Sequence, residues 1–454
     1  MMAHVLLNQW ISVVVTGLAL FLCAKTGWNL FQAHRTQKQY RNNLFLVETI
    51  RPLVFLKIFA ISLYVSFFPQ YLMHITIHSG WPESATSILY VMYQLTVILM
   101  IVPGGYLVEV KNIKRILMVT TFTEALLLVT FGLSTHFWQI VVIQILFGLL
   151  VPISSASEHA YILQLSSEKE RSTAFSLYYN SLKGAMLAGI ALGGSLSLYT
   201  GERGVFLVAG AAVLVATLYV FFCVPNLSAN QHGKHRLTTK KPFNFIFVLK
   251  ALPRAFRNMQ FSKITILIGL TLGILNDGVI LFGMPLILWK HHVPRDQIGQ
   301  ILVLFTIGFF ITNKTISRKA DEWKADSLFL SLGLLGLGIS FFVLAHFGNH
   351  NQSISMMGLL ILMLGLLLSG MFRGFLLSTG LSAVSKNAVT RVIGKNVAMS
   401  IFNFFQTLGT IIGPLFMMFL FNTCDYSSKA FNWVGGIFIA FFLLFILRLS
   451  VRNE

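Results

Sequence analysis

Charged residues are scarce in this chain. Of its 454 residues only 11% are Asp, Glu, Lys or Arg, whereas 56% are hydrophobic, and the mean hydropathy is +0.75. A soluble fold of this composition would have too little polar surface to cover itself, so the bilayer must be the solvent for most of the chain. The composition therefore excludes a soluble globular protein and indicates an integral membrane protein.

Acidic residues are the scarcer kind. The chain has 15 Asp and Glu against 34 Lys and Arg, which gives a net charge of +19. Such a charge suggests nucleic acid at first sight, but the basic residues lie almost entirely in short loops rather than on an amphipathic face or among aromatic residues. Basic loops on the cytoplasmic side of a membrane explain the charge, and no nucleic-acid partner is expected.

Several motifs are also missing. The three cysteines, Cys23, Cys223 and Cys424, have no paired spacing, and we interpret them as packing residues. No glycine-rich phosphate loop with Lys and Ser or Thr occurs, so ATP is not the expected energy source. There is no HExxH, no GxSxG and no metal-spaced Cys/His cluster. We therefore expect no enzyme activity, no cofactor and no metal.

Long apolar segments are what the chain does contain. A helix needs about 20 apolar residues to cross a bilayer, and thirteen segments qualify. The last twelve form two trains of six. The sequence thus predicts an all-α, polytopic membrane protein. The segments are residues 5–24, 52–75, 85–108, 116–134, 139–163, 173–198, 204–224, 262–288, 298–316, 327–347, 354–380, 396–421 and 431–448.

Loop charge predicts the topology. Basic residues fall on alternate loops, and the central loop between the two trains holds seven of them and no acid. Because cytoplasmic loops are enriched in Lys and Arg, the alternation places the C-terminus inside and the N-terminus outside. The seven residues are Lys234, Arg236, Lys240, Lys241, Lys250, Arg254 and Arg257.

Two bundles of six helices use twelve of the thirteen apolar segments, and the first segment is the additional one. A signal peptide is the alternative, but the segment lacks a basic start, and bulky Leu22 lies where a cleavage site needs a small residue. We interpret it as an uncleaved leader helix followed by a cytoplasmic linker. The expected domains are leader and linker 1–51, an N-terminal six-helix bundle 52–224, a basic loop 225–261, and a C-terminal six-helix bundle with tail 262–454.

A short turn after the span 85–108 carries the most specific motif. So tight a turn needs residues that tolerate left-handed dihedral angles, which Gly104, Gly105 and Asn112 supply. The turn resembles the signature between helices 2 and 3 of the major facilitator superfamily, with Asn112 where a second glycine is usual. The resemblance extends over about residues 52–448, and the residues that match the signature are Gly105, Glu109, Lys114 and Arg115.

The resemblance implies two six-helix bundles and alternating access around a site near the membrane midplane. It also implies that Glu109, Lys114 and Arg115 form a cytoplasmic charge cluster that latches the bundles in one state. These residues, with Gly105, are expected to act on conformation rather than on substrate. Glycines spaced four apart, such as Gly189 with Gly193 and Gly409 with Gly413, predict close helix packing.

Polar residues inside the spans are the candidates for chemistry. A charge at the bilayer centre costs about 2.5–3.5 kcal/mol on insertion scales, so each should face a cavity, a partner or a span end. Asp277, beside Asn276, lies halfway along the helix that lines the central cavity in the superfamily. It is our first candidate for proton titration or substrate binding. Arg373 is its natural counter-charge, or an anchor for an anionic group.

Other polar residues have two interpretations each. Glu158 and His159 lie toward the cytoplasmic end of their span, where Glu158 either meets substrate or pairs with Lys114 or Arg115. Glu124 is a buried carboxyl that is protonated or paired, with Lys183 as one candidate partner. Gln70 could orient a ligand, although amides also bond to neighbouring helices.

These features predict a monomeric secondary active transporter of a small organic solute, coupled to protons, in the bacterial cytoplasmic membrane. The leader and linker resemble a bacterial subgroup in which the transporter core follows a membrane-anchored signalling segment. That resemblance leaves an alternative, a sensor or receptor that binds without transport. The linker, about 25 residues long, is too short for an output domain, which favours transport. The fold does not specify a substrate.

Overall fold

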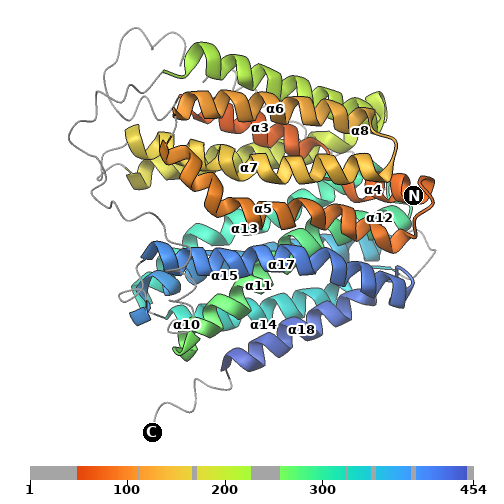
Figure 1. Cartoon of the computed structure of the whole chain (residues 1–454). Coiled ribbons are helices and arrows are strands. Elements are labelled where there is room, and N and C mark those ends of the chain that lie inside the picture. The colour runs from red at the N-terminus through yellow and green to blue at the C-terminus, as the bar shows by residue number, and fades with distance from the viewer. Residues whose placement is uncertain are drawn as a thin grey trace. The chain divides into compact units, whose positions relative to one another are not determined.

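The computed structural model describes residues 49–110, 112–165, 171–225, 256–323, 325–348, 354–389 and 395–446. Within these ranges the chain forms helices joined by short turns, and no strand occurs in them (Figure 1). In a bilayer the backbone must satisfy its own hydrogen bonds, which a helix does. The predicted all-α polytopic class is therefore confirmed. The leader segment and six of the seven central basic residues lie outside the described residues.

The chain divides into two compact units. Unit 1 comprises residues 1–81, 92–243 and 295–300, and unit 2 comprises residues 82–91, 244–294 and 301–454. The short pieces 82–91 and 295–300 are the starts of two helices, so each unit includes a helix end from the other half of the sequence. The predicted boundaries at 224 and 262 remain a prediction, because both fall in or beside the central loop.

Unit 1 begins with a bent pair of helices, α3 (Arg51–Leu63) and α4 (Phe68–His78), which differ in direction by 49°. Pro69 lies in the first turn of α4, where a backbone N–H has no partner within the helix, so its absence loses no hydrogen bond. The same missing N–H prevents α3 from continuing through this position. The pair corresponds to the predicted span 52–75. The helices that follow are η1 (Glu83–Ala85), α5 (Thr86–Val110), α6 (Ile113–Leu133), α7 (Phe137–Leu165) and α8 (Arg171–Cys223).

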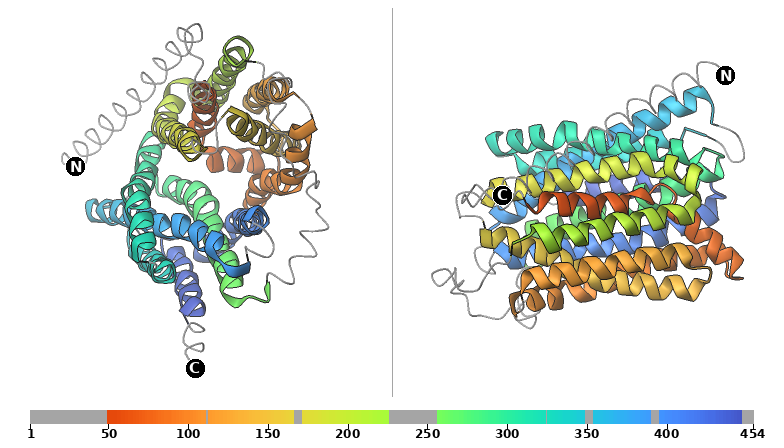
Figure 2. Two further views of the ribbon diagram at one scale, coloured as in Figure 1. Left: turned by 90° about the vertical axis from the view of Figure 1, so that its left-hand side faces the viewer. Right: turned by 90° about the horizontal axis from the view of Figure 1, so that it is seen from above.

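Helix α8 contains two predicted spans, 173–198 and 204–224. Its 53 residues are interrupted at Gly201, whose φ of 72° is left-handed and breaks the helix. Helix α3 packs on α8, and α6 packs on both α7 and α8, so the helices of unit 1 lie side by side (Figure 2).

Unit 2 begins with the helical run Met259–Lys290, which matches the predicted span 262–288. Two stretches of this run are π-helical, η3 (Ile264–Ile268) and η4 (Ile274–Gly283). The π-helical geometry is rare and often marks functional positions, and η4 contains both Asn276 and Asp277. The remaining pieces of the run are α10 (Met259–Lys263), α11 (Gly269–Gly273) and α12 (Met284–Lys290).

The other helices of the C-terminal half match the remaining predicted spans. Eight helices of the described residues are long and apolar enough to cross a membrane, and the bent pair adds a ninth. The break at Gly201 divides one of the eight in two. Charged α13 and the shorter α18 bring the described chain to the expected twelve. These helices are α13 (Arg295–Trp323), α14 (Asp326–Leu344), α15 (Met356–Lys386), α17 (Lys395–Cys424) and α18 (Ala430–Ile446).

The spaced glycines are packing residues. A side chain at Gly193 would collide with the backbone of Leu63 on α3, and one at Gly413 would lie 2.7 Å from the Cα of Gly278 in η4. Small residues let helix backbones approach closely in lipid, where packing replaces the hydrophobic drive. The close packing predicted for these helices is confirmed, and the contact at Gly278 fixes η4 against α17.

The turn before α6 differs from the expectation. Gly104 and Gly105 lie within helix α5, and Asn112 has an extended backbone with φ of −65° instead of a left-handed one. The Asn112 Oδ1 atom accepts a hydrogen bond from the Arg115 amide, so the residue caps the start of α6. Capping, not left-handed geometry, explains an asparagine here.

Candidate functional site

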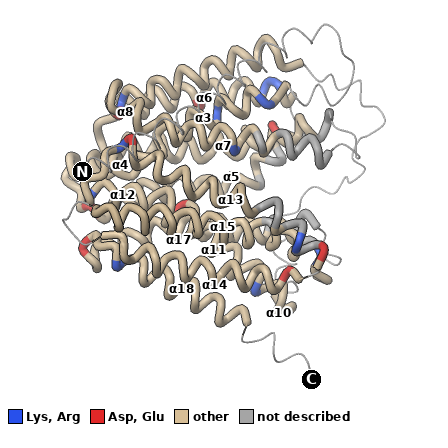
Figure 3. The backbone as a smooth tube through the Cα atoms, turned by 180° about the vertical axis from the view of Figure 1, so that it is seen from behind, with Lys and Arg blue, Asp and Glu red and all other residues tan. Residues whose placement is uncertain are grey.

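Three charged residues of unit 1 meet inside its helices, with Lys57 between two acids. The Lys57 Nζ atom on α3 lies 2.7 Å from Glu158 Oε1 on α7 and 3.3 Å from Glu124 Oε2 on α6. The three residues are 5%, 4% and 1% exposed. Lys57 is six residues beyond Arg51, the first residue of α3, which places it about 9 Å along the helix axis from the helix start. These three charged side chains are therefore buried inside the spans, where charged positions are few (Figure 3).

Two hydroxyl groups complete this cluster. Lys57 also donates a hydrogen bond to Ser154 Oγ, one turn before Glu158 on α7. Tyr178 on α8 donates to Glu158 Oε2 at 2.9 Å. Both oxygens of Glu158 are therefore bonded, whereas Glu124 Oε1 is buried with no hydrogen-bond partner in the described part of the chain. We call Lys57, Glu124, Ser154, Glu158 and Tyr178 the lysine cluster.

Charge balance distinguishes this cluster from a simple ion pair. One ammonium faces two carboxylates, so the fully ionised cluster has a net charge of −1. At 2.7 Å and an effective dielectric constant of about 20, the Lys57–Glu158 attraction is roughly 6 kcal/mol, which exceeds the cost of inserting either charge. The second carboxylate has no cation of its own. A proton on either acid makes the cluster neutral, so the arrangement can hold or release one proton.

Two residues of the lysine cluster are predicted by the sequence, but the base that joins them is not. Glu158 and Glu124 were named as candidates, and Lys57 was not, although a lone lysine inside the apolar span 52–75 carries the same insertion cost. For Glu158 the expected alternative partners were Lys114 and Arg115. The structure instead pairs Glu158 with Lys57, and Lys114 Nζ donates to the Phe221 carbonyl at 2.9 Å.

The structure describes some of the other site residues that were predicted in unit 1. His159, next to Glu158, has its ring 5.2 Å from that of Tyr178 and so borders the lysine cluster. Gln70 on α4 is 1% exposed. Of the latch residues, Arg115 is exposed at the start of α6. Gly105 and Glu109 belong to the last turns of α5, and the Glu109 side chain lies outside the described ones.

Unit 2 places Arg373 among aromatic rings. Its guanidinium carbon lies 5.4 Å from the ring centre of Phe305 and 5.0 Å from that of Phe309, both on α13. Arg373 is 7% exposed, and its Nε atom has no hydrogen-bond partner within the described residues. Cation–π contacts stabilise the charge without using its N–H donors. A guanidinium held in this way can bind a carboxylate or a phosphate through its N–H groups.

Asp277 lies in η4, beside Asn276. Asn276 donates a hydrogen bond to Asp277 Oδ2 at 3.2 Å, and both residues are half-buried. We call Asn276, Asp277, Phe305, Phe309 and Arg373 the arginine site. The pairing of Asp277 with Arg373 remains a prediction. The aromatic pair on α13 was not predicted, because phenylalanine in an apolar span carries no distinguishing signal.

A third polar group lies at the opposite ends of the helices from the basic loops. Lys290 Nζ lies 3.5 Å from Glu83 Oε2 and 4.5 Å from the ring centre of Tyr426, which donates to the same carboxylate at 2.9 Å. Burial, with the Glu83 carboxylate adding to it, raises the pKa of the Tyr426 hydroxyl. Tyr426 is therefore a neutral donor at physiological pH. All three residues belong to unit 2.

Comparison with known proteins agrees with this architecture. The family profile of the Major Facilitator Superfamily matches residues 52–274 and 266–454. The solved structure of the nucleoside transporter NupG is 14% identical and superposes with a TM-score of 0.69, covering 90% of this chain and 100% of that one. No curated protein matches the sequence.

Two further transporter structures share the fold. A bacterial homologue of the human lysosomal transporter Spinster is 11% identical with a TM-score of 0.69, covering 90% of this chain and 96% of that one. A POT family transporter in complex with a thioalcohol-conjugated peptide is 12% identical with a TM-score of 0.68 and the same coverage. At such identities the likeness shows the fold alone. The family match spans most of the sequence, and the protein is therefore a multi-pass membrane transport protein, not an enzyme, that belongs to the major facilitator superfamily.

Proposed function

We propose that the protein is a proton-coupled secondary transporter that moves a small organic solute across the bacterial cytoplasmic membrane as a monomer. The observation that carries this proposal is the buried lysine cluster, in which one base serves two acids. A transporter driven by a proton gradient needs a buried group that exists in two protonation states. Two carboxylates that share one ammonium provide such a group.

The two protonation states differ in what burial costs them. The deprotonated cluster carries an unbalanced negative charge, whose burial is unfavourable, and the protonated cluster is neutral. A conformation that buries the cluster therefore favours the protonated form, and one that admits water favours the charged form. Glu124 is the better candidate for the proton. Glu158 already accepts hydrogen bonds on both oxygens, whereas Glu124 Oε1 accepts none from the described residues.

The arginine site is our candidate for solute contact. Arg373 offers guanidinium donors held by two aromatic rings, and Asn276 and Asp277 add an amide and a carboxylate. This set of groups would bind a solute with an anionic group, and a zwitterion could use both charges. In this assignment Asp277 binds solute, and the proton resides in the lysine cluster.

The decisive experiment is an uptake screen. Membrane vesicles with and without the protein would be given a metabolite extract, and their contents measured by mass spectrometry with and without an imposed proton gradient. We expect an anionic or zwitterionic solute to accumulate only with both the protein and the gradient. A solute that binds but never accumulates would support the sensor alternative, and accumulation that ignores the gradient would contradict proton coupling.

A further inference from the structure

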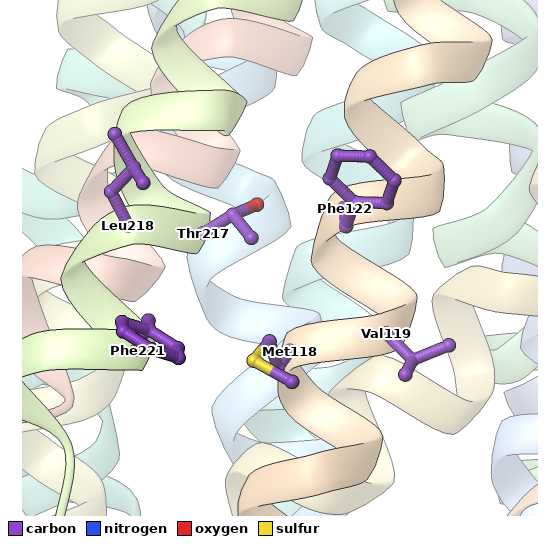
Figure 4. A pocket seen from close by; sticks show the side chains of 6 residues that line it. All are labelled: Met118, Val119, Phe122, Thr217, Leu218 and Phe221. Atoms are coloured by element: carbon purple, nitrogen blue, oxygen red, sulfur yellow. The ribbon is translucent and has the colours of Figure 1, made fainter.

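The hollow between α6 and α8 of unit 1 is lined by apolar side chains (Figure 4). Among the residues that line it, Thr217 has the only hydroxyl, which donates to the Val213 carbonyl at 3.0 Å. Such a hollow offers no group for a charged ligand. The break between α3 and α4, in the same unit, is different.

The turn between α3 and α4 interrupts a helix inside unit 1. Ser66 in this turn is fully buried, and its Oγ atom has no hydrogen-bond partner in the described part of the chain. Pro69 has no N–H to donate to the carbonyl of Val65, so that carbonyl lacks its usual helical donor. Gln70, one turn after Ser66, adds an amide in a residue that is 1% exposed. The break thus gathers a hydroxyl, a carbonyl and an amide away from water.

The first turns of α13 lie against this break. A Cβ atom at Gly299 would be 3.4 Å from the Cβ atom of Ser66, so α13 approaches the turn itself. Asp296, Gly299 and Gln300 follow one another at the spacing that places side chains on one side of a helix. The side of α13 that carries Asp296 and Gln300 therefore faces the break. All of these residues belong to unit 1.

Asp296 and Gln300 bring further polar atoms to this place. Asp296 Oδ1 and Gln300 Nε2 are buried, and neither has a hydrogen-bond partner among the described residues. Gln300 is 3% exposed. A buried polar atom without a partner has lost its hydration and gained no hydrogen bond in exchange. Three such atoms on adjoining segments, with Ser66 Oγ as the third, indicate that a ligand satisfies them.

Charge indicates that this ligand is a cation. The neighbouring Arg295 binds Glu202, with Nη2 2.6 Å from Oε1, and that pair is neutral. Asp296 adds one negative charge. A monovalent ion balances a single carboxylate, whereas a divalent ion would leave an excess positive charge among the helices. Rotation of the Gln300 amide presents its oxygen in place of Nε2, so every group at the position can offer an oxygen to the ion.

We propose that unit 1 binds a sodium ion between the α3–α4 break and the first turns of α13. The ligands are Asp296 Oδ1, Ser66 Oγ and the Val65 carbonyl, with the amides of Gln70 and Gln300 as further oxygen donors. Unwound carbonyls of discontinuous helices coordinate Na⁺ in other secondary transporters. The site is distinct from the lysine cluster, and the proposal does not depend on proton coupling.

Thermal unfolding of the purified full-length protein in detergent tests sodium binding without requiring transport. An ion that binds only the folded state raises the midpoint of unfolding. We expect saturating Na⁺ to raise the midpoint by about 2 °C or more relative to choline at equal ionic strength, with a smaller rise for K⁺. Asp296→Asn removes the charge and should abolish this rise. Ser66→Ala removes one oxygen and should increase the Na⁺ concentration of half-maximal effect by about tenfold or more.

Asp326→Asn is the matched control. Asp326 also lies in the first turn of a helix, α14, where Lys386 Nζ is 3.2 Å from its Oδ2 atom. This variant should keep the wild-type response to Na⁺. If Asp296→Asn does not fold, Ser66→Ala carries the test. Equal midpoints in Na⁺ and choline for the wild type, an unchanged Na⁺ response in Asp296→Asn or in Ser66→Ala, or a response lost in Asp326→Asn would overturn the proposal.

Discussion

The lysine cluster and the arginine site are both buried and charged, but they are balanced differently. In unit 1 one ammonium contacts two carboxylates and the Ser154 hydroxyl, and the Tyr178 hydroxyl donates to one of those carboxylates. In unit 2 one guanidinium lies against two phenylalanine rings, with Asp277 as its predicted counter-charge. The first arrangement has excess negative charge, and the second has a guanidinium Nε atom with no partner among the described residues. A proton suits the first and an anionic solute suits the second.

The largest effect should come from removing the base of the lysine cluster. Lys57→Met leaves two buried carboxylates without a cation, and breaking a buried ion pair in this way costs about 3–5 kcal/mol. We expect a large fall in the midpoint of thermal unfolding in detergent. Neutralising both acids as well, with Glu124→Gln and Glu158→Gln, should recover most of the loss. A variant with Lys57→Met alone that unfolds like wild type would show that the cluster is not the buried unit described above.

Removal of the base of the arginine site should affect binding more than stability. Arg373→Met keeps the apolar contacts with the phenylalanine rings but removes the charge and the donors, and Arg373→Lys keeps the charge without the planar fork. We expect at least a tenfold rise in the KM for solute exchange in both variants, with a smaller stability loss than for Lys57→Met. An unchanged KM in Arg373→Met would exclude this site from solute binding.

A smaller change within the lysine cluster tests its proposed role in proton coupling. Tyr178→Phe removes the donor to Glu158 Oε2, and a hydrogen bond to a charged group is worth about 1.5–3 kcal/mol. Because the fully ionised cluster loses this support and the neutral cluster loses less, the pH of half-maximal uptake should rise, with KM changed little. Tyr179→Phe, at the neighbouring exposed position, is the matched control and should keep the wild-type pH profile. A shift in both variants, or in neither, would contradict a specific role for Tyr178.

The smallest effect is expected at the latch motif. If Glu109 stabilises one state of the transport cycle, Glu109→Gln should slow turnover and leave solute affinity within a few fold of wild type. Equilibrium binding and exchange rates measured on the same preparation separate the two quantities. A large loss of affinity with normal turnover at saturation would place Glu109 in the solute site.

The spans could be predicted from sequence because their physical signal is local. Apolar length gave the twelve core helices, and the break at Gly201 falls between two predicted spans. The motif residue Asn112 was found, but its backbone was predicted wrongly, because an asparagine that caps a helix and one in a left-handed turn share the same sequence context.

The partners within the sites depend on which helix faces meet, and a single sequence does not contain that information. Glu124 and Glu158 are detectable as costly charges inside spans, and Lys57 carries the same signal. Their meeting point requires α3, α6 and α7 to pack in one particular rotation. The same holds for Phe305 and Phe309, which are ordinary apolar residues until Arg373 lies against them.

The most direct test of the account is proton movement in proteoliposomes with an internal pH indicator, once a solute has been identified. The wild type should acidify or alkalinise the lumen as the solute moves down its gradient. Glu124→Gln and Glu158→Gln should abolish this signal while solute exchange continues, because a neutral amide mimics the protonated acid. Asp277→Asn, the matched change in the arginine site, should keep the proton signal and raise KM. Proton movement that persists in both glutamate variants and disappears in Asp277→Asn would contradict the account and assign the coupling to Asp277.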